Sequence, residues 1–206
     1  MSKKLDRQVG ILFLILLIMA ILFFGTVYYQ QKMKYGPYTF DYNGYDVVFL
    51  DEGNGPLYKV KIFLKGVNTP SYINLRTDPR VFDRIDIDID KLDLLKKKEL
   101  FITMHPTEPS VLTVIAAVEI SKITGNQYLF NIPTYGSVIQ DVEGKNETVI
   151  RTCRDVSDDV GIIYLKDGDE TKVYSEDGCV IVQGQTEDEL IEAANKLGLY
   201  LLGIAK

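Results

Sequence analysis

An apolar run near the N-terminus constrains this chain more than any other feature of its sequence. No residue from Val9 to Tyr29 is charged, and as a helix these 21 positions span about 31 Å, the thickness of the hydrocarbon core of a bilayer. The run has no period-two alternation, so only a helix satisfies its backbone in lipid. Tyr28 and Tyr29 lie where interfacial aromatic residues are found. We therefore predict a transmembrane helix over residues 9–29.

Two other readings of this segment stay open. A cleaved signal peptide has a shorter apolar region and a small-x-small cleavage site, whereas this run ends in FFGTVYYQQ. A pilin-like segment also begins with a few charged residues and a long apolar helix. The preceding KKLDRQVG has no evident processing site, and no Glu occurs early in the run. Both patterns favour an uncleaved signal-anchor.

The charges around the run predict its orientation. Three bases precede it, Lys3, Lys4 and Arg7, and two follow it, Lys32 and Lys34, so the positive-inside rule favours a cytoplasmic tail at 1–8 and an extracytoplasmic body after a juxtamembrane linker at 30–37. Beyond residue 36 the chain holds 18 basic and 28 acidic residues, a formal net charge of −10. Because nucleic-acid binders usually carry a basic stripe, we expect no nucleic-acid partner.

The two cysteines and one sequon agree with a place outside the cytoplasm. Cys153 and Cys179 are the only cysteines, and an even pair is typical of one disulfide in an oxidising compartment. Two reduced, buried thiols are the alternative. A disulfide would close a loop of about 27 residues and stabilise the fold by about 3.5 kcal/mol in the chain-entropy model. Asn146 begins an Asn-Glu-Thr sequon, a candidate glycosylation site.

The body divides into two sections, of which the first, residues 38–95, is β-rich. Asn43-Gly44 predicts a hairpin turn between two strands, and Asp78-Pro79 ends the last of four strands. A strand over 57–64 alternates apolar and polar residues, as a half-buried strand does. The expected strands cover 38–42, 45–50, 57–64 and 71–77.

A strictly alternating stretch, 85–90, places three Ile on one face of a strand and three Asp on the other. Asp86, Asp88 and Asp90 are the candidate metal ligands, because D-x-D-x-D begins an EF-hand loop. Counted from Asp86, however, position 6 is Lys91 and position 12 is Lys97, where that loop needs Gly and Glu. We therefore expect a solvated strand face and no metal or other cofactor.

The second section, residues 99–204, predicts an α/β unit. Its expected order is strand (99–104), helix (110–125), strand (127–133), a loop-rich stretch (134–159), three strands and a closing helix. Asp167-Gly168 and Asp177-Gly178 mark turns between strands 160–165, 170–175 and 179–184, which predicts a meander. Thr186 and Glu189 form a capping box for the last helix. The predicted fold class is α+β, with one transmembrane helix, a β-rich section and this strand–helix–strand–meander–helix section.

Several short motifs of this section resemble a known accessory domain. Ala116-Ala117-x-Glu119 running to Thr124-Gly125 looks like a helix of the small α/β domain that precedes the catalytic barrel of β-hexosaminidases and α-glucuronidases. The later strands and the helix from Thr186 are similar in order and spacing. The resemblance covers about 105 residues and implies the accessory fold without the catalytic acid, which lies in the barrel. The whole layout also resembles uncharacterised membrane-anchored archaeal envelope proteins.

The chain offers little catalytic chemistry. His105 is the only histidine and the candidate catalytic residue, because it follows a predicted strand where catalytic groups occur. Cys153 with His105 as its base is an alternative to the disulfide. No G-x-S-x-G elbow, H-E-x-x-H motif or phosphate loop accompanies them. We therefore predict no enzyme.

The expected function is binding or assembly at the cell envelope. The 13 tyrosines lie mostly outside the apolar run and could offer aromatic platforms to a glycan or a protein partner. Two alternatives stay open: a small envelope hydrolase acting on glycans, and an accessory subunit of a membrane complex or pilin-like filament.

Overall fold

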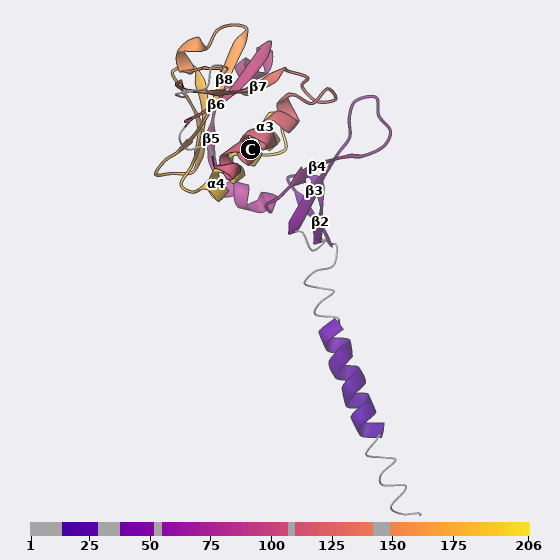
Figure 1. Cartoon of the computed structure of the whole chain (residues 1–206). Helices are drawn as coiled ribbons and strands as arrows, with labels where there is room; N and C mark the ends of the chain where they lie inside the picture. Colours follow the sequence, from indigo (N-terminus) through magenta and orange to yellow (C-terminus); the bar gives the residue numbers. More distant parts are fainter. Residues whose placement is uncertain (1–13, 29–37, 52–54, 107–109, 142–148) are drawn as a thin grey trace, which may run out of the picture.

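A computed structural model describes residues 14–28, 38–51, 55–106, 110–141 and 149–206 (Figure 1). Residues 14–28 form a helix, all of whose side chains are exposed. Among the described residues, no helix is both long and apolar enough to cross a membrane. Residues 9–13 and Tyr29 of the predicted transmembrane run lie outside the description.

The described part of the body is α+β, as the sequence predicts, and contains two sheets. The first is a four-stranded antiparallel sheet in the order β1-β2-β3-β4, formed by Tyr38–Tyr42, Tyr45–Asp51, Pro56–Ile62 and Ser71–Leu75. Asn43 and Gly44 have φ values of 52° and 87°, as a type I′ turn requires, so the predicted hairpin is confirmed. One face of this sheet is apolar and buried, and includes Tyr42, Val47, Val60, Ile73 and Leu75.

The second sheet has six strands in the order β5-β9-β10-β8-β6-β7. Four of them run parallel, namely β6 (Glu99–Met104), β7 (Thr134–Val138), β8 (Val160–Asp167) and β10 (Cys179–Gly184). β9 (Lys172–Glu176) runs antiparallel to β10, and β5 (Asp86–Asp88) pairs with β9. The remaining elements are η1 (Pro79–Arg84), α2 (Lys91–Lys96), α3 (Val111–Thr124), η2 (Cys153–Asp155) and α4 (Glu187–Leu201).

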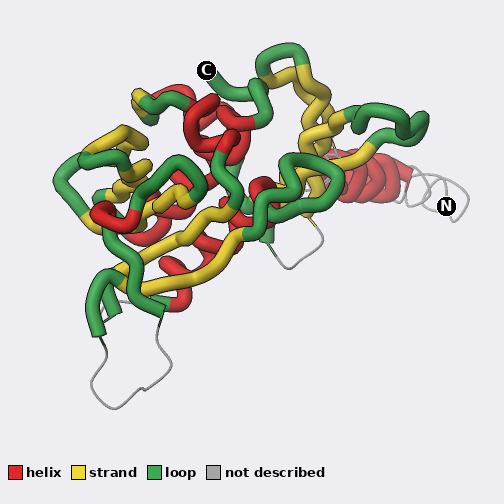
Figure 2. Tube along the Cα trace, turned by 90° about the horizontal axis from the view of Figure 1, so that it is seen from above, coloured by secondary structure: helices red, strands yellow, loops and turns green. Residues whose placement is uncertain are grey.

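Helices α3 and α4 lie between the two sheets (Figure 1), and Figure 2 shows the same elements from above. Strand alternation sorts the side chains of the six-stranded sheet. Leu100, Ile102 and Ile163 face the helices and join one large core that also contains Val60 and Leu75 of the other sheet. Phe101, Ile162, Cys179 and Ile181 point to the opposite face and form a second, smaller cluster. We call this opposite face the outer face.

Two predictions about this sheet are wrong. Residues 127–133 form turns and not a strand. The carbonyl oxygen of Asn126 accepts hydrogen bonds from the backbone N–H groups of Leu129 and Asn131, and Asn131 has a φ of 52°. The strand begins at Thr134 instead. The predicted meander is also wrong, because β10 lies between β8 and β9 and pairs with both; only β9 and β10 form a hairpin.

The observed ends of α3 and α4 agree better with the sequence predictions than the strands do. Ser110 caps α3, and its hydroxyl accepts the N–H of Leu112 and of Thr113, both at 3.1 Å. Gly125 ends that helix. Thr186 caps α4 by accepting the N–H of Glu189 at 3.3 Å. The second half of the predicted capping box is not formed as expected: the Glu189 carboxylate accepts the hydroxyl proton of Thr171 at 2.8 Å.

Candidate functional site

Partly exposed aromatic and polar side chains gather on the outer face of the six-stranded sheet. Strand pairing places Tyr164 of β8 beside Thr103 of β6 and Ile181 of β10, and Ile181 beside Tyr174 of β9. The neighbouring row contains Ile162, Phe101 and Tyr135. Tyr164 and Tyr174 are half-buried and Tyr135 is 49% exposed. The outer face therefore has an apolar floor with tyrosines at its surface.

Residues 149–157, which we call the strap, lie against this face. Ile150 forms an isolated parallel bridge with Val138 at the end of β7. The Thr103 hydroxyl donates to the carbonyl of Arg151 at 2.9 Å, and the Arg151 guanidinium lies 4.6 Å from the centre of the Phe101 ring. These contacts hold the strap by both its backbone and a cation–π interaction.

A disulfide fixes the middle of the strap. Cys153 in η2 and Cys179 at the start of β10 are bonded, with Cα atoms 5.2 Å apart, so the predicted disulfide is confirmed. Next to it, Thr152 donates its N–H (2.7 Å) and hydroxyl (3.0 Å) to one oxygen of Asp155. These hydrogen bonds, the backbone one first, lower the pKa of Asp155. The turn around Cys153 is therefore closed by its own polar groups.

A hollow of about 580 Å³ opens where the strap meets the sheet. Its floor includes the half-buried Tyr164 and its walls carry polar and charged groups. The lining residues are Thr103, Ile139, Thr152, Cys153, Arg154, Tyr164 and Asp177. The volume is in the range of small-molecule sites, and an aromatic ring among a few polar groups is typical of such sites. This hollow is the candidate binding site.

Lysines surround the next tyrosine on the outer face. The ammonium groups of Lys166 and Lys172 lie 5.5 and 5.1 Å from the centre of the Tyr174 ring, and the Tyr174 hydroxyl donates to Gln183 at 3.2 Å. Lys172 also pairs with Glu170 at 2.6 Å, which raises the pKa of the lysine. The tyrosine ring is thus held in place beside the hollow.

His105, the candidate catalytic residue, lies at a different place. It follows β6, and with Lys166 and Asp167 at the end of β8 it lines a hollow of about 20 Å³ on the helix side. That volume holds little more than a water molecule. Cys153, its alternative partner, is in the disulfide on the outer face. The structure therefore does not bring these two residues together as a nucleophile and its base.

The other candidate residues have separate positions. Asp86, Asp88 and Asp90 are exposed, while Ile85 and Ile89 on the other face are buried. Asp90 caps α2 by accepting the N–H of Leu92 at 2.9 Å. Among the described residues, no group of three or more His, Cys, Asp or Glu side chains is placed to hold a metal ion. Asn146 lies outside the described residues.

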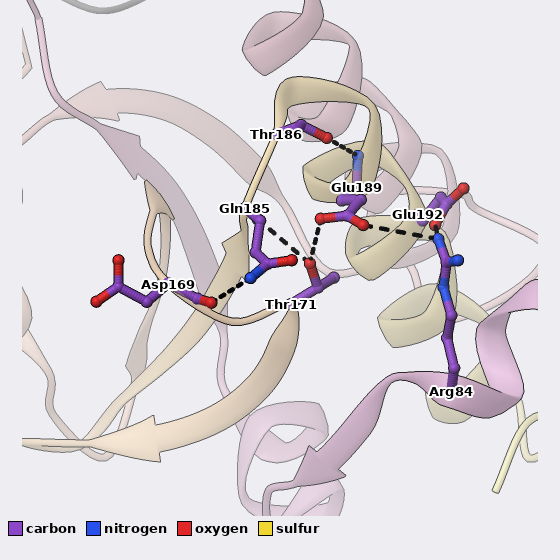
Figure 3. A network of polar contacts seen from close by, with 7 residues as sticks. All are labelled: Arg84, Asp169, Thr171, Gln185, Thr186, Glu189 and Glu192. Carbon is purple, nitrogen blue, oxygen red and sulfur yellow. Dashed lines mark hydrogen bonds and ion pairs between the residues drawn. The ribbon is translucent and has the colours of Figure 1, made fainter.

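The polar network in Figure 3 connects elements of the fold to one another. Arg84 at the end of η1 pairs with Glu192 at 2.5 Å and Glu189 at 3.8 Å, both in α4. Thr171 links Glu189 to the backbone N–H of Gln185, at 2.8 and 3.2 Å. The network joins η1, the start of β9 and the first turn of α4, and so fixes the beginning of that helix.

Comparisons with protein-family models, with curated protein sequences and with solved structures found no match to this chain. The candidate site therefore depends on geometry alone. The sequence indicates Cys153 but not the hollow beside it, because Thr103, Cys153 and Tyr164 come from three separated segments. One signal was present: in VGIIYL the polar-tipped Tyr164 interrupts an otherwise apolar strand.

Proposed function

We propose that this protein is a non-catalytic, membrane-anchored binding module that holds an envelope glycan in the hollow beside the disulfide. The observation that carries the proposal is the hollow itself, about 580 Å³ in volume, with Tyr164 in its lining and one wall held by the disulfide. A covalently fixed wall keeps such a site formed without its ligand, which reduces the entropic cost of binding.

The chemistry of the lining favours a sugar. The apolar C–H faces of a sugar ring stack on tyrosine, while its hydroxyls need hydrogen-bond donors and acceptors at the rim. Thr152, Arg154 and Asp177 supply both kinds of group around Tyr164. A protein partner docking on the same tyrosines is the competing occupant, and the experiment below separates the two.

The proposed anchor is the apolar run 9–29. Support comes from the absence of charge over these residues and from the described helix at 14–28, where large apolar side chains such as Phe24 (69% exposed) belong to neither buried cluster of the described residues. Exposing a whole helix of such residues to water is costly. Lipid around this helix removes that cost.

The proposed extracytoplasmic location of the body rests on three features. A structural disulfide persists in oxidising compartments, the bases before the apolar run outnumber those after it, and Asn146 is in a sequon. Thiol counting on protein taken from intact cells without reductant tests this location. We expect no free thiol; two free thiols would contradict it.

The ligand is tested with the full chain in detergent micelles on an array of envelope glycans. We expect saturable binding that Tyr164→Leu weakens about tenfold, since one stacked ring and its hydroxyl are lost. Tyr128→Leu is the matched control, because Tyr128 is 67% exposed and is not part of the hollow. Glycan binding that is equal in both variants, or absent from the wild type, would refute the proposal, and the second result would favour a protein partner.

A further inference from the structure

A second hollow lies where the four-stranded sheet meets α3 and α4. It has a volume of about 400 Å³ and combines one guanidinium, two carboxylates and an apolar wall. Its lining includes Arg76, Leu112, Ile115, Asp188, Ile191 and Glu192. They come from the end of β4, the first half of α3 and the first half of α4. It is separate from the site of the proposed function.

Within the described part of the chain, the guanidinium of Arg76, which borders this hollow, makes no hydrogen bond. Its side chain is 69% exposed, and its ion pair with Glu119, at 3.9 Å, is too long for a hydrogen bond. No other polar contact of the guanidinium occurs within the described part of the chain. A guanidinium presents a fork that matches a carboxylate with two parallel bonds.

A partly buried ion pair, Glu119 with Lys122, lies beside Arg76 in a neighbouring hollow that Arg76 also lines. Glu119 is 7% exposed and pairs with Lys122 one turn further along α3, and Lys122 donates to the carbonyl of Asn74 at 2.6 Å. Burial lowers the pKa of Lys122, against the opposing effect of Glu119. The pair ties α3 to β4 and leaves Glu119 with one oxygen directed at Arg76.

The two carboxylates of the hollow differ in their contacts. Glu192 is neutralised by Arg84, which lies 2.5 Å away. Asp188, in the first turn of α4, is exposed and makes no ion pair among the residues that the structure describes. One cation and one unneutralised carboxylate therefore border the same hollow, while Leu112, Ile115 and Ile191 supply its apolar wall.

We propose that this hollow binds a zwitterion of the α-amino-acid class with an apolar side chain. The ligand's carboxylate pairs with Arg76, its ammonium group with Asp188, and its side chain packs on Leu112, Ile115 and Ile191. A ligand with a carboxylate alone would be repelled by Asp188, and one with an amine alone would be repelled by Arg76. The charge pattern therefore selects a ligand that carries both groups. The volume is large enough for a ligand the size of leucine.

Isothermal titration of the full chain in detergent micelles tests this inference. The probes are leucine, 4-methylpentanoate, which lacks the amine, and 3-methylbutylamine, which lacks the carboxylate. We expect saturable binding of leucine, with each analogue weaker by about tenfold because one charged group in the hollow is left unpaired. No saturable binding of leucine, or equal binding of leucine and 4-methylpentanoate, would overturn the proposal.

Two variants assign the contacts. Arg76→Gln should weaken leucine about tenfold, and Asp188→Asn should weaken leucine by a similar factor without weakening 4-methylpentanoate. The matched controls are Lys61→Gln and Asp46→Asn, a pair that lies 3.3 Å apart on the exposed face of the four-stranded sheet. Unfolding midpoints like that of the wild type show that a variant is folded. Leucine binding that survives both Arg76→Gln and Asp188→Asn would place the ligand elsewhere and refute the site.

Discussion

The buried hydroxyl of Tyr42 connects the four-stranded sheet to η1. Tyr42 is 3% exposed, and its hydroxyl donates to Asp83 at 3.0 Å. Burial, and then the hydrogen bond and charge of Asp83, raise the pKa of Tyr42 well above its usual value. The folded protein therefore keeps the phenol proton at pH values where the unfolded chain has lost it.

This proton predicts how Tyr42→Phe changes stability with pH. Above about pH 10 the unfolded chain binds fewer protons than the folded one, so the contribution of Tyr42 falls as pH rises. We expect Tyr42→Phe to lower the free energy of unfolding by about 1 kcal/mol at pH 7, and this difference to shrink above pH 10. Urea unfolding at several pH values measures it.

Tyr72→Phe is the control, because Tyr72 is 45% exposed on the opposite face of the same sheet. It should leave the free energy of unfolding unchanged at both ends of the pH range. A Tyr42→Phe difference that is constant with pH would contradict the assigned role of the phenol proton.

Between elements, the backbones of β10 and α4 approach closely at their junction. A Cβ built on Gly184 would lie 2.4 Å from the backbone nitrogen of Leu190 and 2.7 Å from the carbonyl oxygen of Thr186. Both are backbone atoms of the cap and first turns of α4, so they cannot give way as a flexible side chain would. The absence of a side chain at Gly184 lets the helix begin directly against the end of the strand.

Gly184→Ala should therefore lower the free energy of unfolding by about 3 kcal/mol, the cost of overpacking a rigid site. Gly136→Ala is the control, because a Cβ on Gly136 in β7 has no neighbour within 4 Å, and we expect it to change stability by less than about 0.5 kcal/mol. Denaturant unfolding followed by circular dichroism compares the two. Similar midpoints for both variants would show that α4 can shift without cost.

The order of the strands in the six-stranded sheet differs from the order that the turn signals predict. Tight-turn signals on both sides of 170–175 predicted a meander, since turns report only on neighbours in the chain. The apolar run Cys179–Val182 held the better signal, because every residue of β10 is buried and strands covered on both faces read as continuous apolar runs. Such a strand belongs at the centre of a sheet. By contrast, the hairpin at Asn43-Gly44 and the helix after Thr186 were predictable because their causes are local.

The candidate sites were less predictable than the elements. The hollow at Tyr164 needs β6, β8 and the strap together, and the hollow at Arg76 needs β4, α3 and α4. Contacts between such distant segments leave no periodicity in the chain. The cysteine pair was predictable, since two cysteines allow only one intrachain pairing.

In the whole molecule, the two sheets share one core. Leu75 of β4 is 1% exposed and belongs to the same buried cluster as Leu100 of β6, Val182 of β10 and Leu197 of α4. The helices between the sheets contribute side chains to both. A single shared core favours a single cooperative unfolding transition.

Leu75→Ala should accordingly destabilise both sheets. We expect the free energy of unfolding to fall by about 3 kcal/mol, from lost burial and a cavity, and hydrogen-exchange protection of the β10 amides to fall by the same amount, because those amides exchange by global unfolding. Tyr72→Ala, on the exposed face of β4, is the control. Unchanged protection of β10 in Leu75→Ala would mean that the four-stranded sheet unfolds by itself.

The central position of β10 also sets the order of assembly during synthesis. β10 is the last strand of the sheet to be made, yet it separates β9 from β8. Until residues 179–184 emerge, β9 and β8 both lack β10 as a partner, so each has an unpaired edge. Such edges are templates for wrong pairing between chains. A nascent body whose residues 179–184 are still inside the ribosome should therefore depend on chaperones far more than one from which β10 and α4 have emerged.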